Sequence, residues 1–129
     1  MQTAAPGQIV LMLFEGAIRF LDRAETGFEV EDPCEANQAI HNNIVRAQEI
    51  LHELNMALDL EQGGDLAQTL RSLYQYMDRR LLESNLQKTK DGLIEARRHL
   101  TVLQKAWEQM LRGDRTAHAA APGPVLAAA

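Results

Sequence analysis

Four successive stretches of this chain repeat apolar residues at alternating spacings of about four and three. The clearest series consists of Ile40, Ile44, Ala47, Leu51, Leu54 and Leu58. At 3.6 residues per turn, this spacing puts every member of a series on one face of a helix. The pattern is typical of helices that pack at a shallow angle in a bundle, and no stretch alternates with the period of a β-strand. The sequence therefore predicts an all-α fold.

Capping and turn residues give the bounds of the first two helices. Thr3 offers a side-chain oxygen to the free N–H groups of a helix that runs to about Gly27 or Phe28. Asp32 is the expected N-cap of the second helix, which begins at the following proline and extends to about Leu58. Both helices are then long enough to cross a small bundle from end to end.

The second half of the chain is divided in the same way. The paired Gly63 and Gly64 predict a reversal of direction, after which Asp65 caps the third helix. The apolar face of that helix is expected to contain Leu66, Leu70, Leu73, Met77, Leu81 and Ser84. Thr89 is the expected cap of the fourth helix, which ends before Gly113.

Short connections make consecutive helices antiparallel, so the expected architecture is an up-down-up-down four-helix bundle. A chain of 129 residues has the length of one domain. We assign the helical bundle to residues 1–112 and a disordered C-terminal tail to residues 113–129, where the composition is low in complexity and contains two prolines.

Composition and charge exclude several classes of protein. The net charge of −5, with basic residues interleaved among acidic ones, argues against a nucleic-acid partner. No apolar run approaches the roughly 18 residues that span a bilayer, so membrane insertion is not expected. The single cysteine, Cys34, and the absence of a secretory signal pattern predict a reducing, cytosolic location.

One string could belong to a metal-dependent enzyme of the bundle type. Glu49 and His52 form a Glu-x-x-His pair, and di-iron bundles use two such pairs with two further glutamates. A second pair is absent, and both residues lie off the apolar face of their helix, so a chance surface spacing is the better explanation. No phosphate-binding loop or nucleophile arrangement is present either. We expect a non-catalytic protein without cofactor or metal.

Apolar side chains that lie off the single face needed by a bundle are the remaining feature. These residues are Leu11, Met12, Tyr76, Leu82, Ile94 and Val102. These side chains either seal the edges of the bundle or form a groove for an amphipathic helix. The groove is physically reasonable because methionine adapts to varied partners and tyrosine is enriched at interfaces.

Separate strings in the chain resemble the FliS family of flagellar export chaperones. The first is the segment 3–21, TAAPGQIVLMLFEGAIRFL, and the second is the segment 73–81, LYQYMDRRL. The Gly63–Gly64 pair and Ala106–Trp107 occur in the same order as in that family. The resemblance covers about residues 3–111. Phe14 and Glu15 stand where tyrosine and aspartate are common.

The resemblance implies a helical-bundle chaperone of the bacterial cytosol. Such a protein binds the disordered C-terminal segment of flagellin, prevents its premature polymerisation and assists its secretion. An export-gate component or a co-chaperone is an expected further partner. The flagellin-binding surface is predicted to contain Ile9, Leu11, Met12, Ile18, Tyr74, Tyr76, Leu82 and Val102. Arg79 and Arg80 match an Arg-Arg string of the family and either anchor acidic groups of flagellin or form ordinary ion pairs with Asp78 or Glu83.

Members of this family usually carry a further segment upstream of the first string, and it folds over an apolar site. The present chain starts two residues before Thr3, so Ile9, Leu11 and Met12 are expected to lack that cover. We predict that a second copy of the chain or a bound peptide buries them. The alternative function is therefore a non-catalytic helical module that self-associates as a homodimer through its first helix.

Overall fold

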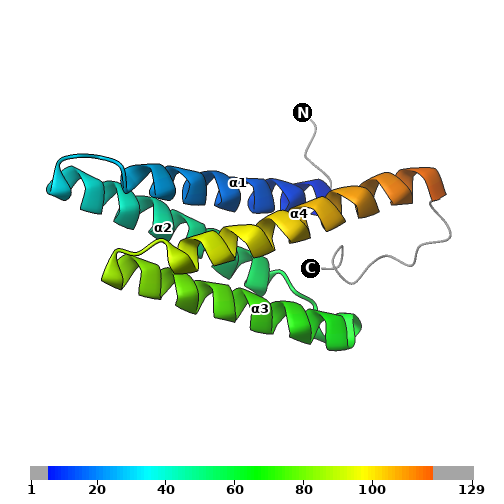
Figure 1. Cartoon of the computed structure of the whole chain (residues 1–129). Helices are drawn as coiled ribbons and strands as arrows, with labels where there is room; N and C mark the ends of the chain where they lie inside the picture. The colour runs from blue at the N-terminus through cyan, green and yellow to red at the C-terminus, as the bar shows by residue number, and fades with distance from the viewer. Residues whose placement is uncertain (1–5, 118–129) are drawn as a thin grey trace.

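The computed structural model describes residues 6–117 as four antiparallel helices (Figure 1). The helices are α1 (Pro6–Gly27), α2 (Pro33–Met56), α3 (Leu60–Gln87) and α4 (Asp91–Ala117). Figure 1 shows that the α1–α2 and α3–α4 turns lie at one end of the molecule and the α2–α3 connection at the other. The described residues contain no strand, and the predicted all-α, up-down-up-down bundle is confirmed.

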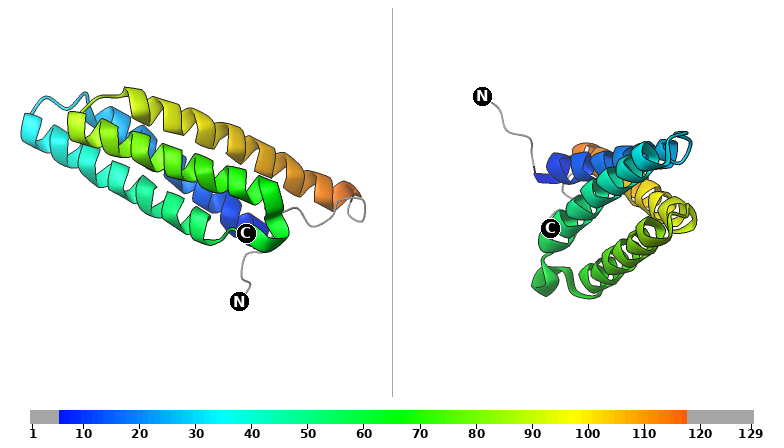
Figure 2. Two further views of the ribbon diagram at one scale, coloured as in Figure 1. Left: turned by 90° about the horizontal axis from the view of Figure 1, so that it is seen from below. Right: turned by 90° about the vertical axis from the view of Figure 1, so that its left-hand side faces the viewer.

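Each helix packs against two neighbours around one shared core (Figure 2). α1 and α3 lie diagonally opposite each other, and both contact α2 and α4. One apolar face from every helix points inward, as the alternating spacing predicts. The largest fully buried side chains include Trp107, Phe14, Leu21, Ile44, Leu51, Leu54, Met77, Leu81, Leu93 and Leu100.

The start of α2 agrees with the sequence, whereas the predicted cap of α1 lies outside the described residues. Asp32 Oδ1 accepts a hydrogen bond of 3.3 Å from the backbone N–H of Cys34, and Pro33 occupies the first turn. Thr3 belongs to residues 1–5, of which the structure gives no description. α1 ends at Gly27, where a Cβ would lie only 3.2 Å from Ile40 of α2, so this glycine allows close packing of the two helices.

The third helix begins earlier than predicted. Asp59, and not Asp65, is its N-cap, because the Asp59 carboxylate accepts hydrogen bonds from the N–H groups of Glu61 and Gln62 at 3.2 and 3.1 Å. Gly64 then has φ 54° and ψ −134°, which are not helical and kink α3 at this residue. Only glycine adopts such a conformation readily. The break that the sequence places at Gly63–Gly64 is thus present as a kink inside α3, whereas the connection between α2 and α3 lies at residues 57–59.

The core face of α3 is rotated relative to the predicted one. The residues that reach the core are Ala67, Leu70, Tyr74, Met77, Leu81, Ser84 and Asn85. Leu66, expected in the core, is 46% exposed, and Leu73 is only half-buried. Both faces keep spacings of three and four, so the series alone cannot distinguish them. Packing between α2 and α4 selects the face that contains Tyr74.

A side chain of α3 caps the beginning of α4. The Ser84 hydroxyl accepts a hydrogen bond of 2.9 Å from the backbone N–H of Leu93 and is buried there. The predicted cap at Thr89 is wrong, because α4 begins two residues later at Asp91. Gly92 lies directly against the Arg80 backbone, where a Cβ would overlap with the Arg80 carbonyl oxygen. The absence of a side chain at Gly92 therefore allows α3 and α4 to approach closely at their turn.

The fourth helix continues beyond its predicted end. It passes through Gly113 and reaches Ala117. A glycine inside a helix costs only about 1 kcal/mol relative to alanine, so one glycine near the end does not stop the helix. The predicted tail from residue 113 therefore begins within α4, and its remaining part, residues 118–129, lies outside the described residues.

Candidate functional site: surfaces on the flanks of the bundle

The ten side chains predicted to bind a partner differ in exposure. Leu11 and Tyr74 lie in the core, where Tyr74 is 3% exposed. Ile18, Tyr76 and Arg80 are half-buried. The exposed members are Ile9, Met12, Arg79, Leu82 and Val102. A core side chain cannot touch a partner while the bundle is closed, so Leu11 and Tyr74 are not available as direct contacts in this structure.

Leu11 and Ile18 belong to the side of α1 that packs against α4. Leu11 and Ile18 precede Glu25 by fourteen and seven residues, so the three side chains share one face of α1. The Glu25 carboxylate accepts a hydrogen bond from Arg97 of α4. Arg97 also donates to the Asp22 carboxylate at 3.0 Å. The hydrogen bond from Arg97 lowers the pKa of Glu25, although partial burial opposes this effect. These ion pairs hold α1 and α4 together along the flank that contains Leu11 and Ile18.

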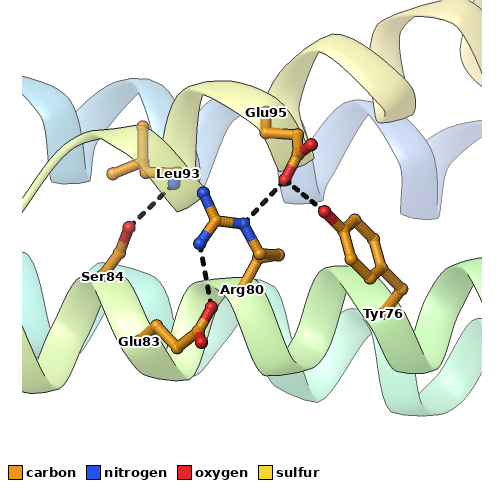
Figure 3. A network of polar contacts seen from close by, with 6 residues as sticks. All are labelled: Tyr76, Arg80, Glu83, Ser84, Leu93 and Glu95. Carbon is orange, nitrogen blue, oxygen red and sulfur yellow. Dashed lines mark hydrogen bonds and ion pairs between the residues drawn. The ribbon is translucent and has the colours of Figure 1, made fainter.

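A polar cluster joins α3 to α4 near their connecting turn (Figure 3). The Tyr76 hydroxyl and Arg80 Nε both donate to Glu95 Oε1, at 2.9 and 2.7 Å. Arg80 Nη1 also donates to Glu83 Oε1 at 2.9 Å. Hydrogen bonds from Arg80 and then Tyr76 lower the pKa of Glu95, and the bond to Glu95 raises the pKa of Tyr76. Arg80 therefore forms the ordinary ion pair with Glu83 that the sequence left open.

Arg79 differs from Arg80 in its surroundings. Its guanidinium carbon lies 5.5 Å from the centre of the Tyr76 ring, and the residue is exposed. An arginine over an aromatic face gains a cation–π attraction while its N–H groups stay accessible. Of the two arginines, Arg79 is the one whose donors remain open to a partner.

Beyond the polar cluster, the α3–α4 flank becomes apolar. We call the following residues the α3–α4 apolar strip: Leu66, Leu73, Val102, Ala106 and Met110. Val102 lies seven residues after Glu95, and Leu73 lies seven before Arg80, so these side chains share the faces that meet in the polar cluster. Val102 is 62% exposed, whereas Leu73 and Met110 are half-buried against the core. The flank is thus bridged by polar groups near the turn and presents apolar surface farther along.

The beginning of α1 adds two exposed apolar side chains at the same end of the bundle. Ile9 is 46% and Met12 59% exposed. The first turn of α1 is tied to the later part of α4, because Trp107 Nε1 donates to the Gly7 carbonyl at 2.7 Å. Figure 1 shows the start of α1, the start of α3 and the later half of α4 at the end opposite the α3–α4 turn. Among the described residues, Ile9 and Met12 are exposed as predicted. The same prediction is wrong for Leu11, which packs in the core and is 9% exposed.

The flank on the other side of α3, between α2 and α3, is hollowed. Three adjoining hollows lie along α2, and neighbouring ones share lining residues. The hollow nearest His41 is lined by α2 residues alone. We call the other two together the α2–α3 groove, and its lining includes Val45, Gln48, Glu49, His52, Asn55 and Asp78. Gln48 Nε2 bridges the helices by donating to the Asp78 backbone carbonyl at 3.3 Å. Leu82 lies one turn after Asp78 and therefore belongs to this side of α3.

One polar atom beside this groove has no hydrogen-bond partner in the described structure. It is Oδ1 of Asn55, which is buried from solvent. Tyr74 lines the same hollow from α3, and burial raises the pKa of its phenol to about 12. Buried acceptors in native proteins are normally paired, so an unpaired one at a hollow calls for an explanation.

Sequence reasoning missed the contribution of α2 to this groove. Surplus apolar residues indicate a partner surface in a sequence, but the groove-facing stripe of α2 is mainly polar. Its signal in the sequence is the spacing of Val45, Gln48, His52 and Asn55, which share one helical face. Such a stripe looks like an ordinary solvated face until the neighbouring helix is known.

The residues that the structure describes contain no group of three or more His, Cys, Asp or Glu side chains able to hold a metal ion. Glu49 and His52, the string tested for a di-iron site, are both exposed on α2. Among the described helices, none combines the length and the apolar character needed to cross a bilayer.

Comparison with known proteins gives consistent matches over most of the chain. Residues 1–114 match the family model described as flagellar protein FliS. The flagellar secretion chaperone FliS of Bacillus subtilis (strain 168) is 32% identical over 113 residues, which are 88% of this chain and 80% of the relative. The flagellar secretion chaperone FliS of Salmonella typhimurium is 36% identical over 108 residues, covering 84% and 78%. The flagellar secretion chaperone FliSB of Pseudomonas aeruginosa is 32% identical over 105 residues, covering 81% and 80%.

Proposed function

The chain belongs to the FliS family of flagellar proteins, and from this membership we propose that it is an export chaperone for flagellin. In this role it binds the disordered C-terminal segment of flagellin in the bacterial cytosol. It prevents premature polymerisation and assists secretion by the flagellar export apparatus. The names of the relatives, all flagellar secretion chaperones, support the proposal.

The observation that carries the proposal is the α3–α4 apolar strip. Val102 and Leu66 are large apolar side chains that remain 62% and 46% exposed in a bundle with a well-filled core. An amphipathic segment that becomes helical on this strip satisfies its own backbone and buries its apolar face. A segment that must not polymerise is sequestered in this way without any covalent chemistry.

The start of α1 is a second contact for the same client. Ile9 and Met12 lie at the end of the bundle toward which the strip runs, so a segment leaving the strip can continue over them. Arg79, with its donors accessible, is suited to an acidic group of the client. Leu11 and Tyr74 support this surface from the core and do not contact the client directly.

Ordering a disordered client offsets part of the binding energy. Coupled folding typically costs about 2 to 5 kcal/mol of the gross interaction free energy. The complex is therefore strong enough to protect the client but can release it at the export apparatus without nucleotide hydrolysis.

The test is calorimetric titration of the full chain with a peptide of the flagellin C-terminal segment. Binding with a negative heat-capacity change is the expected result. V102D is expected to weaken binding at least about tenfold, because a charge is placed in the apolar contact. The matched control is I94D, since Ile94 is also an exposed apolar residue of α4 but lies near Arg97, on the side toward α1. Absence of binding by the unmodified chain, or equal effects of V102D and I94D, contradicts the proposal.

A self-associating module without a client is the second candidate, and the exposure of Ile9 and Met12 favours it. In that case the two side chains bury each other across a dimer axis. Sedimentation equilibrium of the unmodified chain and of M12D separates the two functions. A dimer that M12D dissociates, together with no heat from the flagellin peptide, favours the module over the chaperone.

A further inference from the structure

The α3–α4 apolar strip meets different polar groups at its two ends. Toward the α3–α4 turn it reaches Tyr76, whose hydroxyl donates to Glu95 Oε1 at 2.9 Å (Figure 3). Toward the α2–α3 connection it reaches Asp65, which precedes Tyr76 by eleven residues. Eleven residues are about three turns, so Asp65 and Tyr76 share one face of α3 and lie about 16 Å apart along its axis.

Two arginines flank the strip at its turn end. Arg79 follows Tyr76 by three residues in α3. Arg98 follows Glu95 by three residues in α4 and lies about 140° around that helix from the buried Leu93, so it faces away from the core. Both arginines are exposed, and the hydrogen bond between Tyr76 and Glu95 places them within about one helical turn of the same level. The outer edges of the strip are therefore both positive at this end.

The charges of these two arginines are not neutralised by neighbouring carboxylates. Among the residues that the structure describes, no carboxylate forms an ion pair with Arg79 or Arg98. The nearby carboxylates of Glu83 and Glu95 are both bound to Arg80, at 2.9 and 2.7 Å. Two open guanidinium groups on either side of an apolar strip are suited to a carboxylate, because its two oxygens can accept hydrogen bonds from both.

The far end of the strip carries a carboxylate in place of the arginines. Asp65 is exposed, and no basic group of the described residues forms an ion pair with it. Lys105 is an exposed cation on the same side of α4 as Arg98, seven residues later and about 10 Å farther from the turn. The paired positive charges are therefore confined to the turn end, and Asp65 marks the opposite end.

A helix laid along the strip has a matching polarity in only one of its two directions. Its first turn has free N–H groups and a partial positive charge, and its last turn has free carbonyl groups and a partial negative charge. A segment that ends in its own α-carboxylate adds a full negative charge to the last turn. Such a helix is stabilised when its last turn lies at the arginines and its first turn lies toward Asp65.

We propose that the α3–α4 apolar strip holds its client helix parallel to α3, with the terminal carboxylate of the client between Arg79 and Arg98. The last apolar turn of the client then covers Val102, which follows Arg98 by four residues. The two arginines select a segment that ends in a carboxylate over an internal segment with the same apolar pattern. The inference rests on the proposed chaperone function, since it concerns how the same strip holds the same client.

The test compares two forms of the peptide from the flagellin C-terminal segment, one with its free carboxylate and one with an amide in its place. Both are titrated into the full chain by calorimetry at pH 7, where an α-carboxyl group is ionised. We expect the carboxylate form to bind about three- to tenfold more tightly, because it adds charge-assisted hydrogen bonds. An increase in salt from about 0.05 to 0.5 M should narrow this difference, because the arginines are exposed.

A matched pair of double variants assigns the difference to the two arginines. R79Q/R98Q is expected to abolish the preference for the carboxylate form and to change binding of the amidated form less than about twofold. R71Q/K105Q removes two other exposed cations from the same two helices and should keep the preference. Loss of the preference in both double variants would show that only the overall charge matters, and it would overturn the inference.

The direction of the client is measured with a spin label on the peptide. A label in its last turn is expected to broaden the amide NMR signals of Tyr76 and Glu95 more than that of Leu66, and a label in its first turn should do the reverse. The opposite pattern overturns the inference, as does equal binding of the two peptide forms.

A second probe separates this inference from the chaperone function. It is an amphipathic helix of leucine, alanine and glutamine, unrelated to flagellin and prepared in the same carboxylate and amide forms. A carboxylate preference for this helix without binding of the flagellin peptide contradicts the chaperone function alone. Binding of the flagellin peptide without a carboxylate preference contradicts the direction alone, and binding of neither probe contradicts both.

Discussion

The indole Nε1 of Trp107 donates a hydrogen bond of 2.7 Å to the backbone carbonyl of Gly7, one hundred residues earlier in the chain. The indole ring also meets the Phe14 ring edge-on, with 6.3 Å between ring centres. Trp107 is 1% exposed, so both contacts are protected from water. The late part of α4 thereby fixes the first turns of α1, where the exposed Ile9 and Met12 are displayed.

Replacement of Trp107 by phenylalanine removes this hydrogen bond and retains an aromatic ring. We expect the free energy of unfolding to fall by about 1 to 3 kcal/mol, from the lost bond and the smaller ring. Urea unfolding measures the loss. Amide hydrogen exchange in the first two turns of α1 should accelerate more than in α2, and equal acceleration in both helices contradicts a local role for Trp107.

The helices of this bundle could be predicted from the sequence, but their capping residues could not all be assigned. Apolar spacing alone defines four helices, since few other arrangements bury such faces. Asp59 and Asp65 are both suitable caps, and nothing local distinguishes them before the Gly64 kink is known. Ser84 caps α4 from another helix, so its role depends on a tertiary contact that no local pattern contains.

The candidate surfaces were predictable only in part, for a related physical reason. Val102 and Met12 lie outside the single apolar face that each helix needs for the core, and both are exposed as this position predicts. Tyr74 and Leu73 are adjacent, about 100° apart on the helix, and both border the core, so the packing of neighbouring helices decides which is buried. The α2–α3 groove depends on two polar faces meeting, and a search for surplus apolar residues does not detect it.

Gly92 is predicted to be the least replaceable glycine at the α3–α4 turn. In G92A the new Cβ overlaps with the Arg80 carbonyl oxygen and lies 2.8 Å from Ser84 Oγ, so the helices must separate. We expect a loss of about 3 kcal/mol in the free energy of unfolding. The control is G113A, since Gly113 lies in the same helix and its Cβ meets no atom within 4 Å. Thermal unfolding of both variants is the measurement, and a similar stability for the two contradicts the close contact.

Ser84 tests the same turn by a different interaction. S84A leaves the N–H of Leu93 without its buried acceptor, which should lower the free energy of unfolding by about 1 to 3 kcal/mol. S72A is the matched control, because Ser72 is an exposed residue of the same helix. Chemical denaturation of the two variants decides the matter, and an unchanged midpoint for S84A argues that the hydroxyl does not cap α4.

Tyr74 gives the bundle an alkaline limit of stability. Burial raises its pKa from 10.0 to about 12, so the folded state favours the neutral phenol. Its contribution to stability is complete below pH 10 and is lost as the pH rises through about 12, because the unfolded chain ionises first. Absorbance titration of the tyrosinates is the measurement. In Y76F the late titration of Tyr74, which accompanies unfolding, should remain, whereas Y74F should abolish it. Ionisation of Tyr74 near pH 10 in the folded chain would contradict its burial.

Glu95 gives the bundle an acid-sensitive contact. Hydrogen bonds from Arg80 and Tyr76 hold its pKa below the ordinary value of 4.5. The resulting stabilisation is therefore present above pH 4.5 and is lost as the pH falls through the lowered pKa. In E95Q this part of the acid dependence is absent, so the unfolding free energies of E95Q and the unmodified chain should converge between pH 6 and pH 3. E31Q, at an exposed position of the α1–α2 turn, is the control. A gap that stays constant over this range would show that the Glu95 carboxylate does not bind Arg80 and Tyr76 in solution.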